Sequence, residues 1–196
     1  MKKVPLSSLK NSSGSPETKT TSSATSSLAV QPLSTQSSLI LGIDPGFDRL
    51  GWAVLRTAPN QKPQLLASGL ISTDRQSSHY ERYQTIDADL TQVIHLYQPT
   101  HAAMEKLFFQ SNQKTVMTVS EARGVIMSSL FRAQLPLAEY TPPQIKLAIT
   151  GYGRATKKAI EKLIRLQLNL PPQAKIIDDT LDAMAVALTH ASTVSF

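Results

Sequence analysis

The stretch Leu39–Gly46 constrains the fold of this chain more than any other, because an apolar run ends there in an aspartate at a tight turn. Leucine, isoleucine and Gly42 precede Asp44, Pro45-Gly46 predicts a turn, and the strand-like segment Gly51–Val54 follows. This pattern is typical of a buried strand joined to its neighbour by a short hairpin. Burial of an ionised carboxylate is unfavourable unless a cation compensates its charge. The pattern therefore favours a cation-dependent site at Asp44.

The bulk composition excludes several classes of site. The chain has 196 residues, no cysteine and a formal net charge of +6. Without cysteine it can have no disulfide, no cysteine-ligated zinc and no thiol nucleophile. No apolar run approaches the roughly 20 residues that a membrane-spanning helix needs, so we expect no membrane partner. The length suits one compact domain with a tail, and the positive charge is compatible with a polyanionic ligand.

Residues 1–38 differ in composition from the rest of the chain. They are rich in serine and threonine, contain Glu17 as their single acidic residue and show no hydrophobic period. Such a segment buries too little apolar surface to offset the entropy lost on ordering, so we expect a disordered tail before a folded domain of residues 39–196. The tail has no secretory core and no arginine, which favours a plain disordered extension; a plastid transit peptide is the alternative.

Hydrophobic periodicity predicts one mixed five-stranded sheet flanked by helices. Strands are expected over 39–45, 50–57, 64–73, 101–106 and 135–140, and helices over 79–97, 113–133, 142–150, 155–169 and 178–191. The first three strands have short links and therefore favour an antiparallel meander. The later strands alternate with helices, which places the chain in the α/β class.

Four acidic residues occupy positions at which this fold could bring them together. Asp44 and Glu105 each stand near the end of a strand, and if those strands pair in parallel, both carboxylates lie at the same edge of the sheet. Asp179 and Asp182 are three residues apart at the start of the last helix and so share one face. Complementarity with the helix dipole is an alternative explanation for this pair, and Asp178 is an alternative to Asp179.

Charge balance favours divalent metal ions at these acids. Unpaired carboxylates in one cleft repel each other, whereas two Mg²⁺ ions bring the opposite charge. Mg²⁺ prefers carboxylate oxygens, and two ions about 3.5–4 Å apart can activate water and stabilise the leaving oxygen of a phosphodiester. We therefore expect two Mg²⁺ ions per active site, with Mn²⁺ as a substitute. His190 lies two helical turns beyond Asp182, which favours a core or surface role over that of a ligand.

The chain resembles the RuvC family of Holliday-junction resolvases, a branch of the RNase H-like superfamily. The motifs that carry this resemblance lie, in the family's order, at residues 42–46, 104–108, 121–125 and 179–190. The resemblance implies an RNase H-like fold and a catalytic, metal-binding set made up of Asp44, Glu105, Asp179 and Asp182. It also implies a homodimer that nicks four-way DNA junctions symmetrically during recombination and repair, branch-migration machinery as a partner, and dimerisation through the helix over 113–133.

Five further residues are candidate DNA contacts. Phe108 lies in a loop, where an aromatic side chain can stack on an unpaired base, and the family places an aromatic residue there. Lys157 and Lys158 lie in a basic helix, and Arg154 is expected one turn from Lys157 on the same face. Positive charge at a helix start opposes the dipole unless a phosphate binds there. Lys146 resembles a phosphate-contact position of the family, as does Lys157; a solvated basic face is the alternative, above all for Lys158.

Three other functions compete with junction cleavage. An ATP-binding domain of the sugar-kinase or actin type shares the Gly-Ile-Asp-x-Gly pattern, but it needs a second such loop and a much longer chain. A DNA-binding module without catalysis is disfavoured by the four intact acids. A nuclease of the same fold that acts on RNA–DNA hybrids is the alternative that sequence separates least well from a resolvase.

Overall fold

The computed structural model describes residues 37–106, 113–171 and 173–193. The elements are β1 (Ser38–Asp44), β2 (Arg49–Thr57), β3 (Gln64–Ser72), α1 (His79–Tyr97), β4 (His101–Glu105), α2 (Gln113–Arg132), β5 (Leu137–Tyr140), α3 (Pro142–Thr150), α4 (Lys157–Gln167) and α5 (Asp178–Thr193). Their order and type confirm the prediction, with bounds that differ by no more than two residues. The predicted boundary between a tail and a domain stays a prediction, because residues 1–36 lie outside the described ranges.

The strands form one mixed sheet with the order β3-β2-β1-β4-β5. Strands β1, β2 and β3 are antiparallel neighbours, whereas β4 runs parallel to β1 and β5 runs parallel to β4. This arrangement confirms the predicted five-stranded mixed sheet. In the β1–β4 pair, Ile43 lies opposite Met104. The next residues of these strands, Asp44 and Glu105, therefore end at the same edge of the sheet.

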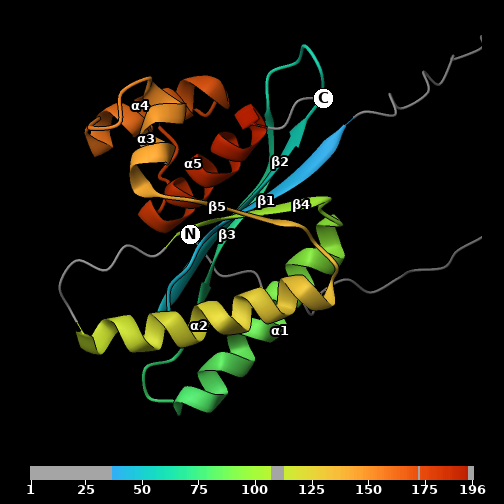
Figure 1. Cartoon of the computed structure of the whole chain (residues 1–196), viewed down its shortest axis with the longest axis vertical. Coiled ribbons are helices and arrows are strands. Elements are labelled where there is room, and N and C mark those ends of the chain that lie inside the picture. The colour runs from blue at the N-terminus through green and yellow to red at the C-terminus, as the bar shows by residue number, and fades with distance from the viewer. Residues whose placement is uncertain (1–36, 107–112, 172, 194–196) are drawn as a thin grey trace, which may run out of the picture. The chain divides into compact units, whose positions relative to one another are not determined.

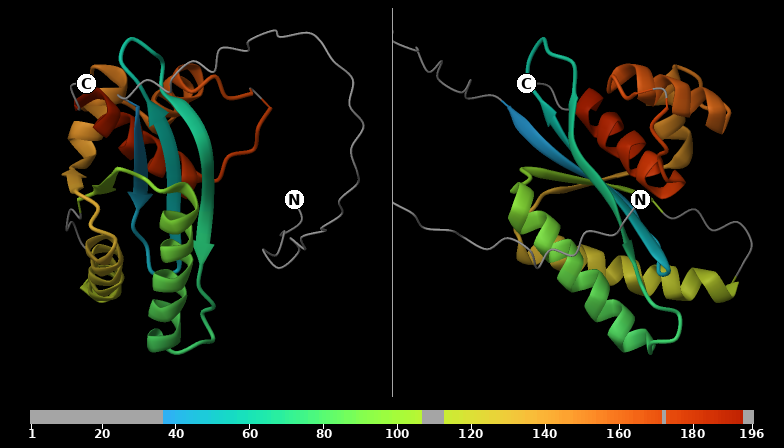
Figure 2. Two further views of the ribbon diagram at one scale, coloured as in Figure 1. Left: turned by 90° about the vertical axis from the view of Figure 1, so that its right-hand side faces the viewer. Right: turned by 180° about the vertical axis from the view of Figure 1, so that it is seen from behind.

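Helices cover both faces of the sheet, as Figure 1 and the right panel of Figure 2 show: α1 and α2 on one face, and α3, α4 and α5 on the other. Because side chains alternate along a strand, β1 supplies both cores. Ile40 packs in the core beneath α5, while Leu41 and Ile43 pack in the core beneath α1 and α2. None of the described helices combines the length and the apolarity needed to cross a membrane.

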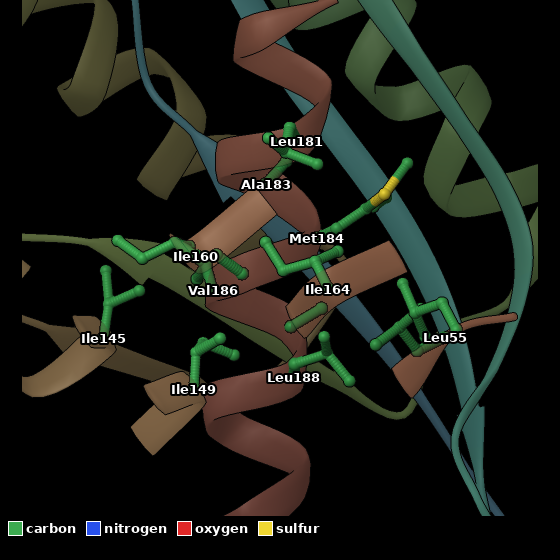
Figure 3. Close-up of a cluster of buried hydrophobic side chains, with 14 of the residues drawn as sticks. Leu55, Ile145, Ile149, Ile160, Ile164, Leu181, Ala183, Met184, Val186 and Leu188 are labelled. Carbon is green, nitrogen blue, oxygen red and sulfur yellow. The ribbon is translucent and has the colours of Figure 1, made fainter. Parts of the chain in front are cut away.

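Helix α5 packs unusually closely on the sheet because two glycines face it. A Cβ atom on Gly42 would lie 2.2 Å from the carbonyl oxygen of Ala183, and a Cβ on Gly51 would lie 2.0 Å from that of Asp179. On its other side α5 shares a core with α4, and Figure 3 shows Leu181 of α5 in the same cluster as the α4 side chains. The two glycines thus let the first turn of α5 reach the ends of β1 and β2.

Candidate active site

Three elements bring carboxylates to one edge of the sheet. Asp44 ends β1 and Glu105 ends β4, while Asp179 and Asp182 lie in the first turns of α5. The negative charges of Asp182, Glu105 and Asp179 all act on Asp44. The structure therefore places the four acids in one electrostatic neighbourhood, whereas their roles in metal binding and catalysis stay predictions.

Burial and mutual repulsion disfavour the charged forms of these acids. Burial, followed by the charges of Asp182 and Glu105, raises the pKa of Asp44 from 3.8 to about 8. Burial and the charge of Asp182 also raise the pKa of Glu105, and burial raises the pKa of Asp182. A carboxyl group in such surroundings keeps its proton at neutral pH unless a cation compensates its charge. Binding of a cation here would release that proton.

Basic side chains already pair with the acids at the margins of the cluster. Arg49 Nη2 lies 2.8 Å from Asp179 Oδ2, and Lys157 Nζ lies 3.5 Å from Asp182 Oδ2 and 3.4 Å from Asp178 Oδ2. Among the residues that the structure describes, no three histidine, aspartate or glutamate side chains are arranged so that they could hold a metal ion. In this arrangement Asp179 and Asp182 are both paired with basic side chains.

The donor set itself fits a hard divalent cation. All four side chains offer carboxylate oxygens, the ligands that Mg²⁺ prefers. Asp179 Oδ2 is buried and, although it is close to Arg49, it forms no hydrogen bond within the described part of the chain. The side chain of Asp178, in contrast, is 73% exposed against 20% for Asp179, and Asp179 is the one whose charge raises the pKa of Asp44. These observations favour Asp179 over Asp178 as the third acid.

Two cavities adjoin the acid cluster. One has a volume of about 240 Å³ and is lined by Glu105, Asp182, Lys146 and Lys157, together with apolar residues of α3, α4 and α5. The other has a volume of about 610 Å³, and its lining includes Asp179. Lysines next to carboxylates suit a phosphate that meets both a cation held by the acids and the ammonium groups. The lining of the first cavity includes Lys146 and Lys157, the two lysines for which the family resemblance implies phosphate contacts.

The remaining candidate DNA contacts lie outside this cavity. Helix α4 begins at Lys157, with the side chain of Thr156 as its N-cap. Arg154 precedes the helix in a turn, so the prediction that it shares a helical face with Lys157 is wrong, because the Thr156 cap starts α4 only at Lys157. Lys158 is exposed on the first turn of α4. Phe108 lies outside the described residues.

Arg123 is a positioning residue that sequence reasoning missed. Its Nη1 donates a hydrogen bond of 2.7 Å to the backbone carbonyl of Glu105, and its Nη2 pairs with Glu139 of β5. Burial lowers the pKa of this guanidinium. The contacts tie α2 to the end of β4 and so fix the backbone that carries Glu105. The available signal was an arginine within a largely apolar helix, in the motif at 121–125.

His190 lies in the core, as expected. Its ring is buried at the end of α5, and its Nδ1 lies 2.8 Å from the hydroxyl oxygen of Tyr140. Burial and the neighbouring His101 lower the pKa of His190. The ring is therefore a neutral hydrogen-bonding group two turns beyond Asp182, and it does not line either cavity described above.

Comparison with known proteins gives a consistent result. A family model described as crossover junction endodeoxyribonuclease RuvC matches residues 40–190. RuvC of Thermosipho melanesiensis is 43% identical over 157 residues, which cover 80% of this chain and 99% of the relative. RuvC of Heliobacterium modesticaldum is 42% identical over 158 residues, which cover 81% and 96%.

Solved structures agree with these matches. Thermus thermophilus RuvC in complex with a Holliday junction substrate is similar to this chain, with a TM-score of 0.74 and 33% identity over 79% of this chain and 93% of that one. A yeast mitochondrial Holliday junction resolvase, only 12% identical, shares the fold with a TM-score of 0.58. The RNase H-like fold and the resemblance read from the motifs are thereby confirmed. The chain belongs to the RuvC family of crossover junction endodeoxyribonucleases.

Proposed function

We propose that this crossover junction endodeoxyribonuclease cuts four-way DNA junctions by phosphodiester hydrolysis at Asp44, Glu105, Asp179 and Asp182. The observation that carries this proposal is the convergence of carboxylates from β1, β4 and α5 around Asp44, whose pKa is raised to about 8 by burial and by its acidic neighbours. A solved relative bound to a Holliday junction substrate supports a junction, rather than an RNA–DNA hybrid, as the substrate.

Mg²⁺ is the proposed cofactor, with two ions per site and Mn²⁺ as a substitute, held by the four carboxylates. When bound, such ions lower the pKa of water and stabilise the leaving oxygen. Asp44 would hold the cation in its ionised form, so binding of the cation would release the proton that the raised pKa retains. Lys146 and Lys157, in the adjoining cavity, neutralise the phosphate and hold it next to the acids.

A homodimer through α2 completes the proposal. Ala122 and Ile126 of this helix are buried in the core shared with α1. On the opposite side Met117, Gly124 and Phe131 follow each other at seven-residue intervals, with Met117 68% and Phe131 83% exposed and open space around Gly124. Exposed apolar residues at this spacing, with a small residue between them, are typical of a helix that packs against another helix. A twofold dimer would offer one site to each of two opposed strands.

Two further assignments follow from family membership. The relatives named above are bacterial, which supports a bacterial protein over a plastid one. We accordingly propose a cytoplasmic location and branch-migration machinery as a partner. Co-purification of tagged full-length protein with a branch-migration ATPase from the native host would test the partner, and enrichment equal to that of an untagged control would refute it.

Cleavage of defined substrates tests the proposed reaction. The protein is incubated with Mg²⁺ and a labelled four-way junction, a linear duplex or an RNA–DNA hybrid. We expect paired, symmetric nicks on the junction alone, loss of cleavage with retained junction binding in Asp44→Asn, and full activity in Asp74→Asn, an exposed control in the turn after β3. Equal cleavage of the hybrid would refute the substrate, and normal cleavage by Asp44→Asn would refute the site.

A further inference from the structure

Lys157 has two acidic partners in very different surroundings. Its Nζ lies 3.5 Å from Asp182 Oδ2 and 3.4 Å from Asp178 Oδ2. Asp182 belongs to the acid cluster and lines the cavity with Glu105, whereas Asp178 is largely exposed. The Lys157 side chain is itself 57% exposed at the start of α4, so its flexible stem can move without disturbing the core. The same ammonium group is thus close both to Asp182, a candidate metal ligand, and to Asp178, which lies outside the acid cluster.

A divalent cation on Asp182 and the ammonium group of Lys157 compete for the same oxygen. Like charges a few ångströms apart repel each other, and the partial burial of Asp182 reduces the screening of this repulsion by water. At the N-terminus of α4 the lysine is also disfavoured by the helix dipole, so it depends on acidic partners. Of its two recorded partners, Asp178 is the one left when Asp182 binds a cation.

We propose that Lys157 is an exchangeable counter-ion, which neutralises Asp182 in the metal-free protein and shifts to Asp178 when a divalent cation binds. The inference rests on the proposed function, because it takes Asp182 to be a metal ligand. Lys157 then opposes cation binding, and Asp178 assists it without touching the metal. Both act as positioning residues for the metal site. Because Asp178 is largely exposed, Lys157 can leave it in turn for a phosphate beside Lys146.

Mn²⁺ binding to the full-length protein without DNA tests this exchange independently of cleavage. Lys157→Met keeps most of the side-chain length and removes the charge, and we expect it to bind Mn²⁺ about 5-fold more tightly in calorimetric titrations. Lys162→Met, an exposed residue further along α4, is the matched control and should bind like the wild type. Tighter binding could not result from structural damage, which would only weaken a metal site. Unchanged or weaker binding by Lys157→Met would overturn the proposal.

Asp178→Asn distinguishes an effect of Asp178 that acts through Lys157 from direct coordination of the metal by Asp178. In the wild-type background we expect about 3-fold weaker Mn²⁺ binding, and in the Lys157→Met background no further loss. An equal loss in both backgrounds would show that Asp178 acts on the metal site without Lys157, as a ligand or through its charge, and would overturn the exchange. Asp44→Asn is the reference for the site. If the wild type binds no Mn²⁺, or Asp44→Asn binds as well as the wild type, the proposed metal site fails; if only Lys157→Met is without effect, the exchange alone fails.

Discussion

Replacement of Asp44 by asparagine is expected to stabilise the metal-free protein, increasingly so as the pH rises. Burial, followed by repulsion from Asp182, Glu105 and Asp179, raises the pKa of this carboxyl from 3.8 to about 8. In the unfolded chain the group ionises near its ordinary value, so between these pH values the folded state binds the proton more tightly. The free energy of unfolding therefore falls as the pH rises through this window, and the full loss is reached above the folded pKa.

The magnitude follows from the two pKa values. At about 1.4 kcal/mol per pH unit, the interval from 3.8 to about 8 corresponds to about 6 kcal/mol above pH 8 and about 4 kcal/mol at pH 7. Asparagine cannot ionise and therefore removes this pH-dependent loss of stability. It leaves a buried amide, which costs about 1–3 kcal/mol if the amide forms no hydrogen bond. We therefore expect Asp44→Asn to exceed the wild type by about 3–5 kcal/mol above pH 8 and to approach it near pH 5.

Urea unfolding in EDTA, followed by tryptophan fluorescence, measures this difference. Trp52 is the only tryptophan in the chain, and its ring centroid lies 5.7 Å from that of Tyr97. Saturating Mg²⁺ should reduce or reverse this difference in the free energy of unfolding, because the metal ion stabilises the folded wild type and is not expected to bind Asp44→Asn. A difference that does not grow with pH, or a variant less stable than the wild type at pH 8, would refute the electrostatic account of Asp44.

Three other variants test separate parts of the argument. Gly51→Ala should lower stability by about 1–3 kcal/mol and junction cleavage more than junction binding, since the new Cβ would lie 2.0 Å from the carbonyl oxygen of Asp179; a stable, fully active variant would contradict the need for this close packing. Lys146→Ala should weaken junction binding for all sequences and reduce the slope of log K against log salt by about 1 in anisotropy titrations, and an unchanged slope would exclude a phosphate contact. Phe131→Asp should yield a folded monomer in sedimentation experiments, and a persistent dimer would contradict an interface on α2.

The order of the elements could be predicted because local signals mark their ends. Helix α1 has the bounds expected from its periodicity, and a capping box at Ser78 and the following Pro99 enclose it. The meeting of Asp44 and Glu105 could also be predicted, because it needs only the parallel pairing of two strands. These inferences depend on short-range patterns and on the rules by which strands pair.

The counter-ions could not be predicted from the same patterns. Arg49 reaches Asp179, and Lys157 reaches Asp182, across segments that are distant in the sequence. Their contacts depend on how closely α5 approaches the sheet and on where α4 begins, and a shift of a few residues in a helix start changes which side chain faces the acids. Arg154 illustrates this, since the cap at Thr156 starts α4 two residues later than expected and leaves Arg154 without a helical face in common with Lys157.

The close seam between α5 and the sheet at Gly42 and Gly51 has a consequence for tolerance to heat. The same contact that packs the core also holds the start of α5, with Asp179 and Asp182, against the sheet that carries Asp44, so a slight loosening would separate the acids proposed to be catalytic while most apolar surface stays buried. Warming should therefore inactivate the enzyme reversibly below the temperature at which its secondary structure melts. Substitutions that stabilise the packing of α5 on the sheet should therefore preserve activity at higher temperature. Substitutions that stabilise only the protein surface should raise the melting temperature without raising the temperature of inactivation.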